Sequence, residues 1–370
     1  MDIKKKSETI SLQKLREKLK DDDFIKEFVT RVLLNKGKEF IYSHSKNSIS
    51  FINEEEKLFK VFSDEYSEEI NKKIFKNSTA LDEIVEIKAG LQAYEKGKGI
   101  PKQTEEDVKN RPYDYTYKFD EETYKYLEGN NVGRYSINWS GQYLKYGENL
   151  AAPRSVELFN GKKIIIREIT GAFPKNIIST YTEEFYLYNR SNIGIIEKEG
   201  KKIDLKYILV VLNSTLISYY FMKNTAKSVR KLFPKIILND LRKFPFKEIS
   251  LQEQQPFIEK ANKMLSLNKN LQELSQKFQR LLTRKFELEK LTTKLQDWYL
   301  LKFSEFVKEL KKLKIKLSLK EEIEWEEIFL EKKEEAEKVK NEIEMTDKEI
   351  DGMVYELYGL SEEEVRVVES

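Results

Sequence analysis

The stretch LKYILVVLNSTLISYYFMKN, residues 205–224, decides the fold, because it is apolar around nearly its whole circumference. Asp204 directly precedes it and is a typical N-cap residue, so the stretch is predicted to form one helix. A helix without a polar face must be covered on all sides. Short β-type segments lie around it in the chain, and we therefore expect this helix to pack against a sheet.

These β-type segments are rich in β-branched and aromatic residues and are separated by Gly, Pro and Asn. Examples are IVEIKAGL, KKIIIREI, NIISTYTEEFYLYN and FPKIIL. They predict a β-rich domain over residues 79–250, of the α/β or, as we expect, the α+β class, with helices packed on its strands.

From Leu251 onward the turn signals disappear and helix formers dominate. Apolar residues recur there at coiled-coil spacing, namely Leu267, Leu271, Leu274, Phe278, Leu281, Leu288 and Leu295. Residues 251–370 are therefore predicted to be a long-helix, coiled-coil-like scaffold. It continues in a charged helix over about 320–345 and ends in a helical cap, with a stop at Gly359 and a capping box at Ser361 and Glu364. A helical hairpin that only supports the β-rich domain is an equally compatible interpretation.

The first 78 residues form a third zone, in which apolar residues recur at helical spacing from Ser11 to about Leu34. This zone is predicted to be a helical lead-in or linker. With the two zones that follow, the division of the chain is 1–78, 79–250 and 251–370.

Composition excludes several kinds of chemistry. The 370 residues include no cysteine and one histidine, so disulfides, zinc–cysteine sites and nearly all histidine chemistry are excluded. No apolar run reaches the length of a membrane span, and the first residues lack the apolar core of a signal peptide. We expect a cytoplasmic protein with no membrane partner. GxxxxGK[ST], GxGxxG and Asn-Pro-Pro-aromatic sequences are absent too, so no catalytic residue, cofactor site or metal site is predicted in this chain.

Charge is distributed unevenly along the chain. The net charge is only +3, from 67 Lys and Arg against 64 Asp and Glu. Residues 201–250, however, contain eleven basic and three acidic residues, whereas residues 321–370 contain six and nineteen. Such asymmetry favours a nucleic-acid-binding face on one side and a solvated or protein-facing segment on the other, although chance clustering is the alternative.

The stretch NVGRYSINWSGQYLKYGENLAAPR, residues 131–154, combines cations, amides and flat rings. Cations suit phosphates, amides and guanidinium groups suit base edges, and rings suit sugars or bases. A structural alternative stays open, in which the aromatic residues cover a sheet and the polar residues cap turns. The candidate DNA-binding residues are Arg134, Asn138, Trp139, Ser140, Gln142, Tyr143, Lys145 and Arg154 in this stretch, and Arg167, Lys227, Arg230 and Lys231 beyond it.

Several strings in this order resemble the TaqI-like C-terminal specificity region of adenine-N6 DNA methyltransferases. They include ALDEIVEIKAGLQAYEKGKG, YLEGNNVGRYSINWSGQYLKYGENLAAPR, LFNGKKIIIREITG, YILVVLNSTLISYYF and DGMVYELYGLSEEEVRVVE. The resemblance spans about residues 79–370. That region occurs in single-chain restriction-modification enzymes and is similar in layout to the specificity subunits of multi-subunit systems. The resemblance implies that the β-rich domain recognises a target in duplex DNA, while the long helices hold it against a methyltransferase core.

The methyltransferase core that the resemblance implies is missing from this sequence, together with its S-adenosylmethionine loop. The chain is thus expected to be a recognition fragment of a larger enzyme, or a separate specificity chain, and to be non-catalytic by itself. S-adenosylmethionine is expected on a core in cis or on a partner subunit. Two other function classes stay open: an RNA-binding module, and a coiled-coil assembly protein without nucleic-acid specificity.

Overall fold

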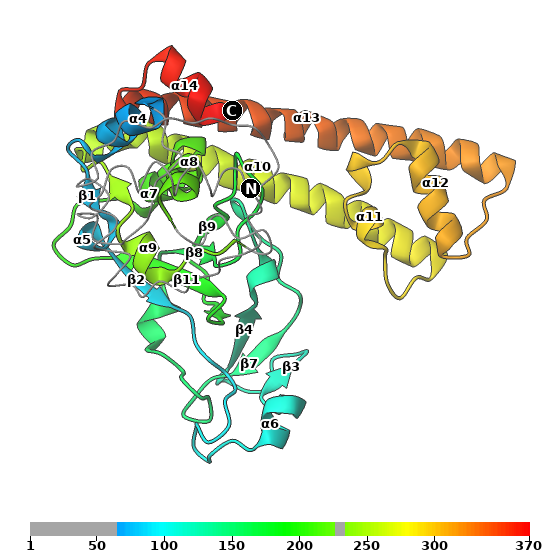
Figure 1. The fold of residues 1–370 in the computed structure, drawn as a ribbon. Coiled ribbons are helices and arrows are strands. Elements are labelled where there is room, and N and C mark those ends of the chain that lie inside the picture. Colours follow the sequence, from blue (N-terminus) through cyan, green and yellow to red (C-terminus); the bar gives the residue numbers. More distant parts are fainter. Residues whose placement is uncertain (1–64, 226–233) are drawn as a thin grey trace, which may run out of the picture. The chain divides into compact units, whose positions relative to one another are not determined.

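The computed structural model describes residues 65–225 and 234–370, and residues 71–370 form one compact unit. Figure 1 shows its strands on one side and two long helices, α10 and α13, leading away from them. The predicted lead-in over residues 1–78 lies largely outside the described residues. Its described end contains helix α4 (Glu65–Phe75), and β1 begins directly after this lead-in, at Thr79.

A four-stranded antiparallel sheet, in the order β2-β11-β8-β9, forms the centre of the β-rich part. Its strands are β2 (Val85–Ala89), β8 (Lys163–Arg167), β9 (Ser179–Thr182) and β11 (Asn192–Glu197). Three successive isoleucines of β8, Ile164 to Ile166, are completely buried. Since neighbouring side chains of a strand point to opposite faces, both faces of this sheet must be covered. The α+β class predicted from the sequence is confirmed.

The decisive stretch 205–224 does pack against this sheet, but as two helices instead of one. Helices α7 (Leu205–Leu212) and α8 (Thr215–Asn224) are bent by 64° to each other. Asp204 caps α7 as predicted, and Ser214 caps α8 by accepting from the Ile217 N–H. At the break, the side chain of Asn213 bonds Ser179 of β9 in both directions. These local and tertiary hydrogen bonds overcome the helical preference of the apolar sequence.

A second sheet, in the order β10-β4-β7-β3, includes residues 143–145 of the stretch 131–154 as its strand β7. Its strands are β3 (Asp114–Tyr115), β4 (Thr123–Leu127), β7 (Tyr143–Lys145) and β10 (Leu187–Tyr188). One apolar cluster joins it to the first sheet, since Leu144 and Tyr188 pack in the same cluster as Ile165 of β8. The two sheets therefore share a core.

Short elements complete the β-rich part. A hairpin of β5 (Val132–Gly133) and β6 (Ser136–Ile137) contacts the first sheet at β9 and the long helix α10. The others are β1 (Thr79–Ala80), α5 (Leu81–Ile84), α6 (Glu105–Asn110), η2 (Gly129–Asn131), η3 (Val156–Leu158), α9 (Leu238–Arg242) and β12 (Pro245–Phe246).

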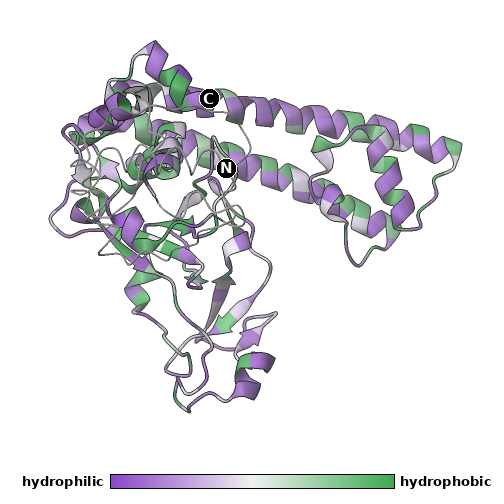
Figure 2. Cartoon of the chain, in the orientation of Figure 1, coloured by the Kyte–Doolittle hydropathy of each residue, from purple (hydrophilic) through white to green (hydrophobic). Residues whose placement is uncertain are grey.

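Helices α10 (Leu251–Phe286) and α13 (Leu319–Tyr358) run side by side (Figure 1). They are antiparallel, because Lys260 pairs with Glu349 whereas Lys263 pairs with Glu342. Figure 2 shows α13 as mostly hydrophilic with scattered apolar positions. The segments between them are α11 (Thr293–Gln296), η4 (Trp298–Leu300) and α12 (Phe303–Lys312), and α14 (Glu362–Glu369) follows α13.

An aromatic cluster fills the space between these helices far from the sheets. Phe278 of α10 stacks on Trp298, with ring centroids 4.0 Å apart, and Phe306 stacks on Phe329 of α13 at 4.9 Å. We refer to the segments around this cluster, residues 287–318 with the helix ends they join, as the tip.

The tip corrects the prediction of one long helix that continues beyond residue 286. Helix α10 ends at Phe286, because Glu287 adopts the left-handed conformation with φ of 50°. Leu288 and Leu295 therefore leave the helix and pack in the aromatic cluster of the tip. The spacing of seven residues between Leu281, Leu288 and Leu295 therefore reflects burial in a compact cluster and not the seam of one continuous coiled coil. At the other end, Gly359 and the capping box of Ser361 and Glu364 are confirmed, although α13 includes the residues predicted as a separate short helix.

Among the described residues, no single helix is both long enough and apolar enough to cross a membrane, while the bent pair α7 and α8 meets those criteria only when taken together.

A buried ion-pair network joins the β5–β6 hairpin, the break between α7 and α8, and α13. Arg134, in the hairpin turn, donates to both carboxylate oxygens of Asp347, at 2.9 and 3.0 Å, and to the carbonyl of Asn213 at 2.9 Å. Lys175 pairs with Asp347 at 3.3 Å and with Asp351 at 2.6 Å. We call these four charged residues the joint.

The joint also caps a helix. Asp351 accepts hydrogen bonds from the backbone N–H and the hydroxyl of Thr215, both at 2.8 Å, at the N-terminus of α8. Burial by itself opposes the charge of Asp347, but the hydrogen bonds and charges of Arg134 and Lys175 outweigh it, so the pKa of Asp347 lies below its usual value. One turn of α13 therefore holds both the hairpin and α8.

Replacing Asp347 with alanine should destabilise the protein, because it leaves the guanidinium of Arg134 without its carboxylate. Both side chains of the pair are mostly buried, with 22% and 15% exposed. We expect a loss of about 2–3 kcal/mol in the free energy of unfolding, somewhat below the cost of breaking a fully buried pair. Urea denaturation measures it.

The matched control is Glu349→Ala, which removes an exposed pair between α10 and α13 and should cost less than about 1 kcal/mol. Because the folded pKa of Asp347 is lowered, its contribution is present above about pH 4 and is lost as the pH falls further through that pKa. Asp347→Asn should therefore flatten the loss of stability in acid. Equal losses for Asp347→Ala and Glu349→Ala would contradict a structural role of the joint.

Candidate nucleic-acid interface

Three of the predicted DNA-binding residues support one another on the second sheet. The indole N–H of Trp139 donates to the carbonyl of Gln142 at 2.7 Å, and its ring meets Tyr143 edge-on at 5.0 Å between centroids. The Gln142 amide donates to Asp114 at 2.8 Å. Trp139 also packs on the core cluster of this sheet and is only partly exposed. The structural alternative considered for the aromatic residues thus describes Trp139 well.

The remaining candidates are spread over several places. Lys145 pairs with Asp120 at 2.7 Å, and Ser140 and Arg154 are exposed, the latter with a left-handed φ of 66°. Arg134 does not face solvent, because it belongs to the joint. Arg167 is the last residue of β8 in the first sheet. Lys227, Arg230 and Lys231 lie outside the described residues.

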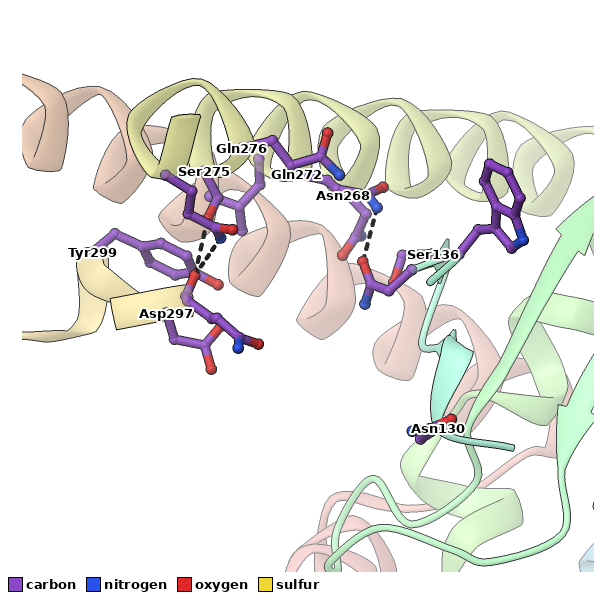
Figure 3. Close-up of a pocket in the computed structure, with 13 residues that line it drawn as sticks. Asn130, Ser136, Asn268, Gln272, Ser275, Gln276, Asp297 and Tyr299 are labelled. Carbon is purple, nitrogen blue, oxygen red and sulfur yellow. Dashed lines mark hydrogen bonds between the residues drawn. The ribbon is translucent and has the colours of Figure 1, made fainter. Parts of the chain in front are cut away.

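A cleft of about 550 Å³ separates the hairpin region from α10 (Figure 3). Asn138 and Trp139 lie on one side of it, the long helix α10 on another, and the segment 296–299 of the tip closes the end. Seven amide side chains line it: Asn130, Asn138, Asn268, Gln272, Gln276, Gln279 and Gln296. The remaining lining residues are Ser136, Leu271, Ser275, Asp297 and Tyr299. We call this the amide cleft.

Hydrogen bonds fix the walls of the amide cleft. The Gln272 amide donates to the carbonyl of Ile137 at 2.9 Å and to the side-chain oxygen of Asn138 at 2.8 Å. At the other wall, Gln279 donates to the carbonyl of Gln296 at 2.7 Å. The cleft is therefore held open by α10 bonding to the hairpin and to the tip.

The α10 residues of this cleft were not among the residues predicted from the sequence. Asn268, Gln272, Gln276 and Gln279 recur three or four residues apart, so they share one helix face. One feature of the sequence could have indicated this face of α10. It carries neutral amides, whereas α13 carries paired charges.

Exposed cations lie among the amides of α10 and beyond them. Lys269, Lys277, Arg280 and Arg284 are exposed, and none forms an ion pair with a described residue. The last three line a shallow hollow with Leu281 and Thr283. On α13, by contrast, lysines pair with glutamates of the same helix, as Lys338 does with Glu334 at 2.7 Å. Unpaired cations beside neutral amides form a surface suited to a polyanion with hydrogen-bonding groups.

Part of the chain is similar to a known family of specificity domains. Residues 124–246 match the model of the TaqI-like C-terminal specificity domain, which confirms the resemblance for this part of the chain. Residues 250–354 match a domain of unknown function, DUF8810. No curated protein matches the chain.

Solved structures that resemble the chain include three restriction-modification proteins. The type IIL enzyme MmeI in complex with DNA has 11% identity and a TM-score of 0.32 over 50% of this chain. The type I S subunit from M. genitalium has 15% identity and a TM-score of 0.31 over 56%, and the HsdS subunit from Thermoanaerobacter tengcongensis has 10% and 0.29 over 63%. The chain spans 28%, 44% and 48% of these proteins, respectively.

Replacing Trp139 with alanine should lower the melting temperature, because the ring packs on the core and its N–H is bonded within the sheet. We expect a loss of about 2 kcal/mol, less than the roughly 3–5 kcal/mol for a fully buried tryptophan. Thermal unfolding measures it. The exposed neighbour Ser140→Ala is the control and should leave the melting temperature unchanged. If the Trp139→Ala variant melts at the same temperature as the wild type, the packing role of Trp139 is wrong and a binding role is left.

Proposed function

We propose that this chain recognises a specific sequence in duplex DNA, as the specificity part of a restriction-modification adenine-N6 methyltransferase. One observation carries the proposal: α10 forms one wall of an amide cleft beside residues 130–139, and the same helix carries exposed cations that pair with no carboxylate of the described residues. The match of residues 124–246 to the TaqI-like specificity domain supports it.

The two parts of this surface suit the two parts of a duplex. Lysine and arginine bind phosphates and give affinity that depends on salt but not on sequence. Amide side chains donate and accept at base edges and can give preference for one sequence. The amides of α10 and the hairpin lie within reach of the exposed cations Lys269 and Arg280 on the same helix, so one duplex can meet both groups.

Methyl transfer is assigned to a methyltransferase core, in cis or as a separate subunit, and the cytoplasm is the compartment where such a system meets DNA. S-adenosylmethionine would bind that core. The amide cleft does not fit this cofactor, because none of its lining residues is a cation that could pair with the methionine carboxylate.

Arg280→Ala and Arg284→Ala should each weaken binding to all duplexes alike. A preferred duplex is first selected from a random pool, and its dissociation constant is then measured against salt, beside an unrelated duplex and a single-stranded RNA. Each lost phosphate contact should lower the slope of log affinity against log salt by about one unit, while the preference stays.

Lys338→Ala is the matched control, since Lys338 is exposed but paired with Glu334 on α13. It should change neither affinity nor slope. Equal affinity of the wild-type chain for the selected duplex, the unrelated duplex and the RNA would refute sequence-specific duplex recognition.

The purified chain should neither bind S-adenosylmethionine nor methylate DNA by itself. Isothermal titration with the cofactor and transfer of labelled methyl groups to the selected duplex measure the two properties. Adding a cognate methyltransferase subunit should restore transfer to that duplex. Methyl transfer by the chain alone would overturn the assignment of catalysis to a separate core.

A further inference from the structure

The bonded amides of α10 use their N–H groups within the protein and leave their side-chain oxygens free. The amide of Gln272 donates to Ile137 and Asn138, that of Gln279 donates to Ser275 and Gln296, and that of Asn268 donates one bond, to Met264. Their side-chain oxygens have no hydrogen-bond partner among the described residues. This wall of the amide cleft is therefore rich in acceptors.

Two further groups add to this character. Asp297, at the tip end of the cleft, has no ion-pair partner in the described part of the chain, and partial burial raises its pKa. Gln276 is exposed, and both ends of its amide are free of bonds to described residues. It occupies the middle of the α10 wall, one turn from Gln272.

An acceptor-rich wall without a cation disfavours phosphate and favours a ligand that supplies N–H donors. In the major groove of DNA such donors are the amino groups of adenine at N6 and of cytosine at N4. Glutamine and asparagine pair with adenine through both of their polar ends, and a carboxylate accepts from cytosine. The lining of the cleft thus matches the edge of an amino-bearing base.

Two arginines follow the amides along the same row of α10. Gln272, Gln276, Arg280 and Arg284 follow one another at intervals of four residues, so they form one row on α10, with the amides first and the cations after them. A duplex that presents a base edge to the amides can therefore place its backbone over the arginines.

We propose that the α10 amides, with Gln276 at their centre, read an adenine or cytosine amino group of the target, so that the helical scaffold is itself part of the specificity surface. This inference rests on the proposed function and assigns part of base recognition to residues outside the 124–246 domain.

Amino-group deletion in the DNA tests the inference. In the selected duplex, each adenine is replaced in turn by purine and each cytosine by 2-pyrimidinone, which remove only the exocyclic amino group. Wild-type affinity should fall about 5- to 150-fold at one or more positions, as expected for a lost base contact. The Gln276→Ala variant should bind the unmodified duplex more weakly than the wild type by a similar factor. Deleting the amino group that Gln276 reads should then weaken binding by this variant little further.

Asn270→Ala is the matched control, an exposed amide on α10 that does not line the cleft. It should keep the wild-type profile over all analogues. If Gln276→Ala also keeps that profile while the wild type still prefers its duplex, the inference is wrong and the proposed function stands. If the wild type prefers no duplex, the proposed function fails and this inference fails with it.

Discussion

The pairing of Arg134 with Asp347 is the interaction on which the arrangement of the candidate interface depends. A guanidinium in the turn of a two-residue hairpin would ordinarily face water, but this one is mostly buried and needs a carboxylate. The carboxylate comes from a helix more than two hundred residues later in the chain. Because two parallel N–H donors meet two oxygens, the pair fixes direction as well as distance. The hairpin therefore lies against the helix pair in one orientation, and α10 lies opposite Asn138.

The amide cleft follows from that orientation. Gln272 can bond the hairpin only because the joint has already placed the hairpin beside the helix pair. Apolar contacts alone would allow the two parts to slide, since they have no preferred direction. Charged and amide groups thus fix this contact at the hairpin, whereas apolar side chains fill it elsewhere, as where the ring of Phe257 in α10 meets that of Tyr207 in α7. The amide cleft is the part of this polar contact that stays open to a ligand.

Local signals in the sequence predicted much of the fold. Asp204, Gly359 and the pair Ser361 and Glu364 end or begin helices through bonds to nearby backbone, and such bonds depend on neighbours in sequence. The break at Asn213 was not predictable in this way, because it depends on Ser179 in a distant strand. For the site, composition pointed to residues 131–154, of which Asn138 and Trp139 do line the cleft. It could not show that Arg134 is buried, nor that the α10 amides face the hairpin, since both facts depend on which distant segments meet.

The α10–α13 pair contributes to the aromatic cluster at the tip and, at its other end, buries apolar residues such as Phe257 and Val354, and α13 is mostly hydrophilic (Figure 2). Because the tip has an apolar cluster of its own, it can open as a unit without melting the sheets. Trp298 anchors this unit by stacking on Phe278, and the neighbouring residues Asp297 and Tyr299 form the end wall of the cleft. Local opening of the tip would therefore remove that wall while the specificity domain stays folded. The stability of a few stacked rings thus sets the fraction of molecules in which the cleft is closed and able to bind.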